Sequence, residues 1–205
     1  MDASVEEKIR QIKKEFRLVM NGPASQSMRE KGLDYRVNWG VPFVQLRHMA
    51  STMGQDYELA VAMWKENVRE CKILATLMMP PEKMCEDIAE IWMDQIHTQE
   101  LAELLAFNLL QHVSFAPEIA FKWMASHENM RQICAYDLIG RLFMKGQEPN
   151  ERGIHEFLDQ ACAALQSESV GVRHAAMNAV TRFAGMGVVY ERMAKDNLKR
   201  LGIDF

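Results

Sequence analysis

The sequence predicts an all-α protein, and three observations support this prediction. Apolar residues recur at spacings of three and four residues from one end of the chain to the other, the pattern of amphipathic helices. Alternating runs rich in Val, Ile and Thr, which would indicate strands, are missing. Between residues 55 and 186 the helical segments come in pairs of roughly 30 to 35 residues, which is the period of helical solenoids. We therefore expect an α-solenoid built from antiparallel helix pairs.

Residues that favour helix ends divide the chain into these helices. Near the N-terminus, Ser4 with Glu7 predicts a capping box before the first helix, and Gly22 with Pro23 predicts the end of that helix. Further helix starts are expected at N-cap residues and at prolines in a first turn, namely Pro42, Asp56, Pro81, Thr98 and Pro117.

The length of 205 residues is within the range of a single domain. We expect one domain over residues 1–205, with N-terminal helices in 1–54, paired-helix repeats in 55–186 and a C-terminal helix in 187–205. A hydrophobic fraction of 48% and a charged fraction of 25% are typical of globular proteins. No stretch approaches the roughly 20 apolar residues of a membrane helix, and the charged start is unlike a secretory signal. We expect a cytoplasmic protein with no membrane partner.

Cysteines and known sequence motifs narrow the range of functions. The four cysteines, Cys71, Cys85, Cys134 and Cys162, form no CxxC pair and lie in apolar helical patterns, so we expect buried, reduced thiols. No Walker loop, GxGxxG, HExxH or GxSxG is present. An iron site in a helical bundle would require two copies of a pattern of histidine and glutamate. The spacing of His97 and the glutamates after it occurs only once in the chain. We expect no metal, no nucleotide and no other cofactor.

The first helices of the pairs share a short motif. It reads "LAVAMW", "IAEIWM", "IAFKWM" and, more loosely, "IHEFLDQA". The residues at nearly equivalent places are Trp64, Trp92, Trp123 and Phe157. We interpret them as repeated core residues that wedge adjacent pairs together; the alternative is that they stack on a ligand.

The second helices begin "VRECKILA", "TQELAELL", "MRQICAYDL" and "VRHAAMNAV". An arginine stands near the start of three of them, as Arg69, Arg131 and Arg173, with Gln99 in the fourth. Because a cation at a helix N-terminus is mildly unfavourable, the recurrence needs another explanation. Each arginine could pair with an acid of the neighbouring repeat, or the arginines could form a row that follows a phosphate backbone. The net charge of −4 argues against indiscriminate nucleic-acid binding, but a basic stripe on an acidic body can still bind phosphates.

Glu103 is the candidate catalytic residue. It lies among Leu101, Ala102, Leu104 and Leu105, in a helix whose counterparts carry the arginines. A carboxylate beside a row of arginines could stabilise a positive charge that develops during a reaction. The alternative is a solvated residue bonded to the nearest arginine.

The order of three segments resembles the bacterial DNA alkylation repair family, whose best-known members are AlkD-like glycosylases. The segments are "GVPFVQLRHMA" at 40–50, "LAVAMWKENVRECKILATLM" at 59–78 and "VRHAAMNAVTRF" at 172–183. The resemblance spans roughly residues 15 to 200. It implies a right-handed superhelix of HEAT-like antiparallel helix pairs. It also implies excision of cationic alkylated purines by hydrolysis of the N-glycosidic bond, with duplex DNA held in a concave groove.

The resemblance also implies roles for single residues. The family's Trp-x-x-x-Asp pattern falls within "HTQELAEL", where Thr98 or Gln99 takes the place of the tryptophan. The aspartate, which supports the oxocarbenium-like sugar and the attacking water, corresponds to Glu103, whose side chain is one methylene longer. Arg131 or Ile133 corresponds to the arginine of the next repeat that helps hold the backbone.

A further tryptophan of active members is replaced in the last repeat by Ala179 or Asn178. Loss of two positioning aromatics and a longer acid predict weak or absent glycosylase activity, because small misplacements of reacting groups slow a reaction strongly.

Two functions therefore follow from the sequence. The first is a DNA-directed protein that binds double-stranded DNA, plain or alkylated, through Arg69, Arg131 and Arg173, either as a diverged alkylpurine glycosylase that uses Glu103 or as a binder of damaged or structured DNA. The second is a catalytically inactive HEAT-like scaffold for a protein partner.

Overall fold

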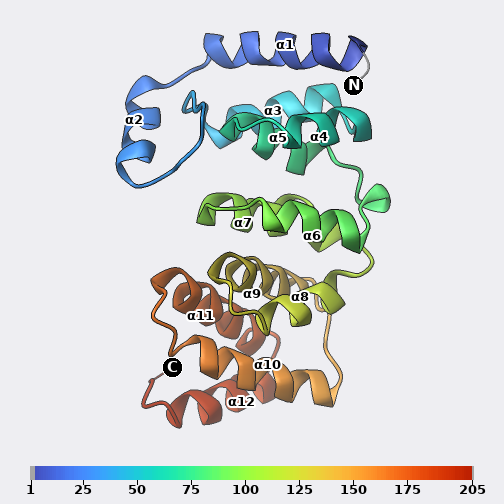
Figure 1. Ribbon diagram of the computed structural model, residues 1–205. Helices are drawn as coiled ribbons and strands as arrows, with labels where there is room; N and C mark the ends of the chain where they lie inside the picture. Colours follow the sequence, from blue (N-terminus) through green and yellow to red (C-terminus); the bar gives the residue numbers. More distant parts are fainter. Residues whose placement is uncertain (1–2, 205) are drawn as a thin grey trace. The chain divides into compact units, whose positions relative to one another are not determined.

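The computed structural model describes residues 3–204, and their regular structure is helical apart from one parallel bridge between Val37 and Val68 (Figure 1). The α-helices are α1 (Ala3–Leu18), α2 (Gly22–Glu30), α3 (Phe43–Met53), α4 (Tyr57–Trp64), α5 (Arg69–Met78), α6 (Glu86–Asp94), α7 (Gln99–Asn108), α8 (Ala116–Met124), α9 (Asn129–Met144), α10 (Glu151–Ala164), α11 (Val170–Ala184) and α12 (Val188–Lys199). Two short 3-10 helices are η1 (Pro81–Lys83) and η2 (Leu110–His112).

The chain divides into two compact units, an N-terminal unit that ends at Leu109 and a C-terminal unit that begins at Leu110. The repeated motifs fall on α4, α6, α8 and α10, and the sequences predicted as second helices fall on α5, α7, α9 and α11. The helix pairs expected from the sequence are therefore present. The single domain expected over residues 1–205 stays a prediction.

Several predicted helix starts are confirmed by their hydrogen bonds. The Asp56 carboxylate accepts the N–H of Leu59 at 3.0 Å, and the Thr98 hydroxyl accepts the N–H of Leu101 at 3.4 Å, so both residues cap their helices. The three predicted prolines also stand at helix starts: Pro42 immediately before α3, Pro81 at the start of η1 and Pro117 in the first turn of α8.

Two predictions at the N-terminus were wrong. Helix α1 already includes Ser4, so Ser4 is not the residue before the helix. Gly22 and Pro23 open α2 instead of closing α1, and the Asn21 side chain accepts the N–H of Ala24 at 3.0 Å as the cap of α2. Proline fits this place because a first-turn N–H has no partner inside the helix.

The tryptophans of the repeat are core residues in the N-terminal unit. Trp64 of α4 and Trp92 of α6 are 2% and 3% exposed, and their rings stack with centroids 4.1 Å apart and planes 3° apart. Each ring therefore fixes the distance between one helix pair and the next, which confirms the interpretation of this motif as stacking surface.

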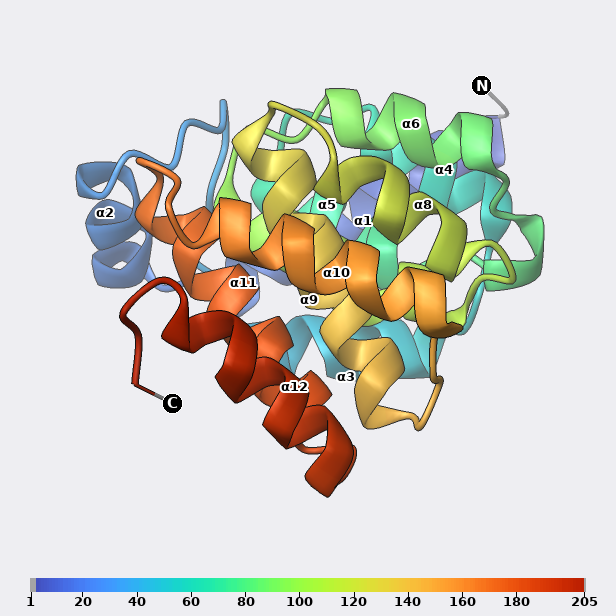
Figure 2. The same ribbon diagram turned by 90° about the horizontal axis from the view of Figure 1, so that it is seen from below.

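The core of the C-terminal unit is also aromatic. Phe157, the fourth member of the motif, contacts Phe143 of α9 and Phe183 of α11, with ring centroids 4.9 and 5.2 Å apart. Helices α9 and α11 approach closely at Gly140, where an added Cβ would lie 3.5 Å from the Cα of Ala179. Helix α12 packs against α11 and α10 (Figure 2).

The cysteines are free, but not all of them are buried as expected. Cys71 and Cys134 are buried, Cys162 is half-buried and Cys85 is exposed. Burial raises the pKa of the Cys71 thiol to about 12, so this residue stays protonated and unreactive. Cys85 is exposed because it stands at the N-cap of α6, in the loop after η1, and not on an apolar helix face.

Gly40 is required by the packing of the loop before α3. Its φ angle is +69°, and a Cβ at this position would lie 2.3 Å from the carbonyl oxygen of Asn21 and 2.7 Å from the backbone nitrogen of Ser25. Gly40→Ala should therefore lower the free energy of unfolding by about 2–4 kcal/mol, from backbone strain and steric overlap together.

Gly146→Ala is the matched control, because Gly146 has a similar φ of +72° but open space around it. Gly146 stands just after α9, where the N–H of Gln147 donates to the carbonyl of Leu142 as in a left-handed helix C-cap, so this control should cost only about 1 kcal/mol of strain. Urea unfolding followed by circular dichroism gives both values, and equal losses would contradict the role of close packing at Gly40.

Candidate nucleic-acid interface

Arg69, at the start of α5, lies in the interior of the N-terminal unit, where its side chain is 2% exposed. Its Nε and Nη2 donate to the two carboxylate oxygens of Glu100, at 2.8 and 2.5 Å. Its Nη1 donates to the carbonyl of Val41 at 3.1 Å and to Glu70 at 3.3 Å. Glu100 belongs to α7 of the next helix pair. Arg69 therefore has a structural role, pairing with an acid of the neighbouring repeat, in place of the DNA contact expected from the sequence.

The charge of Arg69 is maintained by these partners. Burial alone would lower the pKa of its guanidinium, but the hydrogen bonds and charge of Glu100, followed by the charge of Glu70, raise this pKa above its ordinary value. Glu70 also accepts the N–H groups of Trp39 and Val41, at 3.1 and 3.2 Å. The ion pair thus holds the loop before α3 against α5.

Arg131 and Arg173, the other two arginines of the predicted row, lie in the C-terminal unit and have different surroundings. The Arg131 side chain is 13% exposed, lies over the ring of Trp123 at 5.7 Å and donates to Glu128 at 3.3 Å. Nη1 of Arg173 donates to the carbonyls of Ser167 and Glu168, at 2.5 and 3.0 Å. Both arginines are partly exposed and both also stabilise the turn before their helix.

Glu103 is exposed on α7 and accepts a hydrogen bond of 2.7 Å from the side-chain amide of Gln99. Gln99 and Glu103 therefore form a surface pair, one helical turn apart. Thr98, the other residue considered at the family's tryptophan position, is 8% exposed, and its hydroxyl also bonds to the hydroxyl of Tyr35 at 2.9 Å. No aromatic side chain of the kind expected in an alkylpurine site stands at either position.

The remaining positions carried over from the resemblance lie in the C-terminal unit. Ile133, the alternative to Arg131, is 1% exposed and belongs to the core. Ala179 is also 1% exposed, whereas Asn178 is exposed on α11. Asn178 is therefore the one of these two that faces solvent.

The structure shows a group of polar and basic residues that the sequence analysis missed. Two stripes of residues at intervals of four run along neighbouring helices: Asp137, Arg141 and Lys145 at the end of α9, and His174, Asn178 and Arg182 on α11. Arg141, Arg182, Asp137 and Asn178 line a hollow of about 180 Å³, whose floor is formed by Gly140 and Ala179. The spacing of four residues is the signal of these stripes in the sequence, and it lies outside the helix starts where Arg69, Arg131 and Arg173 recur.

Gln111 of η2 accepts hydrogen bonds from two of these cations. Its side-chain oxygen accepts from Nε of Arg141 at 3.4 Å, and its backbone carbonyl accepts from Nζ of Lys145 at 2.7 Å. Burial and the nearby charge of Arg141 lower the pKa of Lys145. Burial, followed by the charges of Lys145 and Arg141, lowers the pKa of His112. Burial is the larger cause of both shifts, and the charges of the neighbouring cations add to it.

Comparison with known protein families identifies the family of this chain. The sequence profile of a family described as "DNA alkylation repair enzyme" matches residues 12–139. The chain belongs to the DNA alkylation repair enzyme family. A search of curated proteins finds no match.

A solved structure adds evidence on the fold of this family member. That protein is described as belonging to "a new family of proteins related to the HEAT-like repeat DNA glycosylases with affinity for branched DNA structures". It matches with a TM-score of 0.81 at 17% identity, over 93% of this chain and 81% of the other. The likeness confirms the all-α, HEAT-like fold predicted from the sequence.

Two further findings concern membranes and metals. No helix within residues 3–204 has both the length and the apolar character needed to cross a membrane. Among these same residues, histidine, cysteine, aspartate and glutamate side chains form no group of three or more that could hold a metal ion.

The role of Arg69 can be tested by stability. Arg69→Met should lower the free energy of unfolding by about 3 kcal/mol, because Glu100 and Glu70 would lose their buried counter-ion. Arg173→Met should cost only about 1 kcal/mol, since its guanidinium bonds to loop carbonyls at the surface. Urea unfolding measures both, and a stability of Arg69→Met equal to that of the unmodified protein would contradict a structural role for Arg69.

Proposed function

We propose that this family member binds DNA, both duplex segments and the duplex arms of branched structures, through the stripes on α9 and α11. The observation that carries the proposal is that Arg141 and Arg182 line a hollow open to solvent, with Lys145 one helical turn beyond Arg141. Cations on two neighbouring helices can neutralise successive phosphates, which is the main source of affinity for nucleic acids. Membership in a DNA repair family and the branched-DNA affinity described for the structural relative support this assignment.

The arginines predicted from the sequence enter the proposal differently. Nη1 of Arg173 is used by loop carbonyls, and its Nε and Nη2 make no hydrogen bond within residues 3–204, so they can donate to phosphate. Arg131 is partly exposed and is kept as a second phosphate contact. Arg69 is omitted because its donors are used by Glu100, Val41 and Glu70. We also propose a cytoplasmic location, as expected from the resemblance to a bacterial family that acts on DNA.

Hydrolysis of the N-glycosidic bond of alkylated purines is the second candidate function, with Glu103 as the carboxylate. The resemblance assigns Glu103 to the position of the family's catalytic carboxylate, which favours this function. Its exposed place on α7 and its hydrogen bond to Gln99 argue against it, since a catalytic carboxylate acts best in a site that excludes water. We therefore propose DNA binding with weak or absent excision.

DNA binding can be tested with variants of the cluster. Arg141→Ala and Arg182→Ala should each weaken binding to a duplex and to a four-way junction, and each should reduce the slope of log affinity against log salt by about 1. Fluorescence anisotropy over a range of salt concentrations measures both quantities. Arg173→Ala and Arg131→Ala should act in the same direction.

Arg152→Ala is the matched control, because Arg152 is an exposed cation of the same unit on α10, outside the two stripes. It should leave the affinity and the salt slope unchanged. No detectable binding by the unmodified protein at low salt would refute the proposal, and an equal loss in the control would show that only net charge matters.

Excision can be tested with DNA that carries N7-methylguanine or N3-methyladenine. We expect the unmodified protein to release base at or only slightly above the spontaneous rate, because the positioning aromatics are missing and Glu103 is solvated. Chromatography of released base gives the rate. Robust release that disappears in Glu103→Gln, with DNA binding intact, would establish the glycosylase and overturn this expectation.

A further inference from the structure

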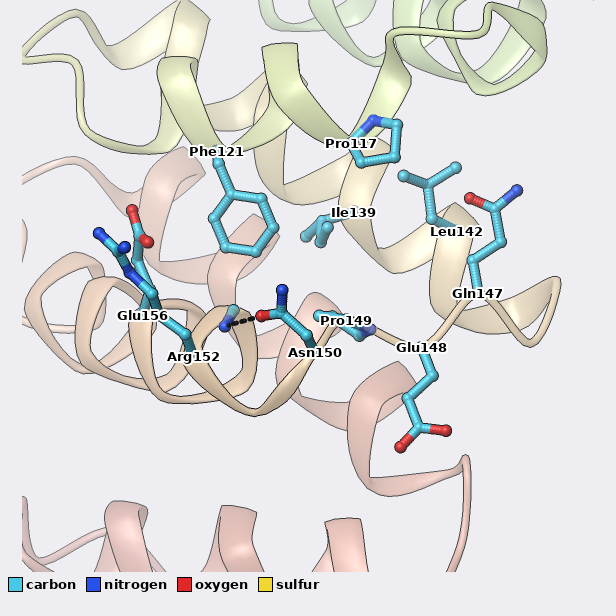
Figure 3. Close-up of a pocket in the computed structure, with 11 residues that line it drawn as sticks. Pro117, Phe121, Ile139, Leu142, Gln147, Glu148, Pro149, Asn150, Arg152 and Glu156 are labelled. Atoms are coloured by element: carbon cyan, nitrogen blue, oxygen red, sulfur yellow. Dashed lines mark hydrogen bonds between the residues drawn. The ribbon is translucent and has the colours of Figure 1, made fainter.

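A second cavity lies in the C-terminal unit, away from the two basic stripes. It has a volume of about 420 Å³ and lies between the start of α8, the end of α9 and the start of α10 (Figure 3). We call it the α8–α10 cavity. Its apolar walls are Pro117 and Phe121 of α8, Ile139 and Leu142 of α9, and Pro149 of the loop before α10.

A glycine in the first turn of α10, Gly153, lines the cavity. A Cβ at Gly153 would lie 3.0 Å from Cβ of Pro149 and 3.6 Å from the ring of Phe121. The glycine therefore leaves a backbone surface where another residue would fill space. A volume of about 420 Å³ is within the range of pockets that hold small ligands or a large side chain, roughly 300–1,000 Å³.

One hydrogen-bond donor points into this apolar space. Asn150 caps α10, and its side-chain oxygen accepts the N–H of Gly153 at 2.8 Å. That bond fixes the amide plane, so the Nδ2 group is directed between Phe121 and Pro149 (Figure 3). This Nδ2 group makes no hydrogen bond within residues 3–204. It is placed to donate to a carbonyl oxygen of a bound molecule.

The rim of the cavity is mainly acidic. Two of its three charged lining residues are Glu148 and Glu156, and the third is Arg152. All three are exposed, as is Glu151 at the start of α10. The hydroxyl of Tyr190 donates to the carboxylate of Glu148, which points away from the apolar walls in Figure 3. An acidic rim repels phosphates and attracts cations, so DNA is not the occupant of this cavity.

We infer that the α8–α10 cavity binds a short segment of a partner protein in which one apolar side chain is flanked by lysine or arginine. The apolar side chain fills the space between Phe121, Leu142 and Pro149. The main-chain carbonyl of the segment accepts from Nδ2 of Asn150, and the flanking cations meet Glu148 and Glu156. An apolar pocket with few, well-placed polar groups at its edge is the usual form of such a site.

This inference does not rest on the proposed DNA binding. The cavity is lined by residues of α8, α9, α10 and the loop before α10, whereas the proposed phosphate contacts use other residues, on the stripes of α9 and α11. The two sites share no lining residue. A bound segment and bound DNA therefore need not compete within the C-terminal unit.

Nuclear magnetic resonance of the full-length, ¹⁵N-labelled protein tests the inference with three synthetic peptides. Acetyl-Lys-Leu-Lys-amide should give saturable shifts of the backbone amides of Gly153 and Asn150 and of the Asn150 side-chain amide. Acetyl-Lys-Ala-Lys-amide should bind about tenfold more weakly, because less apolar surface is buried. Acetyl-Glu-Leu-Glu-amide should bind more weakly than the cationic peptide at low salt, and the difference should shrink at high salt.

Variants of the rim separate this site from general attraction to an acidic protein. Glu148→Lys/Glu156→Lys should reverse the preference between the cationic and anionic peptides, and Asp159→Lys, an exposed charge on α10 outside the cavity, should not. Saturating duplex DNA should leave the peptide shifts in place. Equal shifts with all three peptides, or no saturable shift at Gly153 and Asn150, would overturn the inference whether or not DNA binds.

Discussion

A buried guanidinium organises the N-terminal unit. Arg69 is 2% exposed, and removing such a charge from water costs several kcal/mol unless the charge is paired and fully hydrogen-bonded. Its partners come from three places: Glu100 on α7, Glu70 on α5 and the carbonyl of Val41 in the loop before α3. Glu70 in turn accepts hydrogen bonds from backbone N–H groups of that loop. The need to satisfy one charge therefore fixes the next helix pair and the entering loop in place.

In the other helix pairs, the polar residue near the start of the second helix makes different contacts. Arg131 lies over Trp123, Arg173 bonds to the carbonyls of the preceding turn, and Gln99 pairs with Glu103. A polar side chain thus recurs near the start of the second helix, but its partner differs and comes from the loop or helix that lies nearest. This explains why an arginine that recurs in the sequence does not form a row of equivalent cations. The cations that we propose as phosphate contacts, Arg141 and Arg182, instead stand more than two turns later on the same helices.

Features set by local chemistry could be predicted from the sequence, and features set by packing could not. The capping roles of Asp56 and Thr98, and the core positions of Trp64 and Trp92, follow from helix-end preferences and from helical periodicity. The buried state of Arg69 depends on a carboxylate 31 residues away, which no local pattern reveals. The basic cluster likewise depends on the close approach of α9 and α11 at Gly140 and Ala179. Glu103 was identified from a resemblance, and its exposure was visible only in the folded chain.

Local arrangement of charge also resolves the conflict between a net charge of −4 and a role in DNA binding. In the C-terminal unit, Arg141, Lys145 and Arg182 gather on one pair of helices, while Glu148 and Glu156 stand at the rim of the α8–α10 cavity. At physiological salt the field of an exposed charge decays over about 8 Å, so charges that are further apart than this do not cancel. Under the proposed function, a polyanion at α11 responds mainly to the cations nearest to it. Under the further inference, the acidic rim attracts a cationic segment, so a small net charge is compatible with two surfaces of opposite preference.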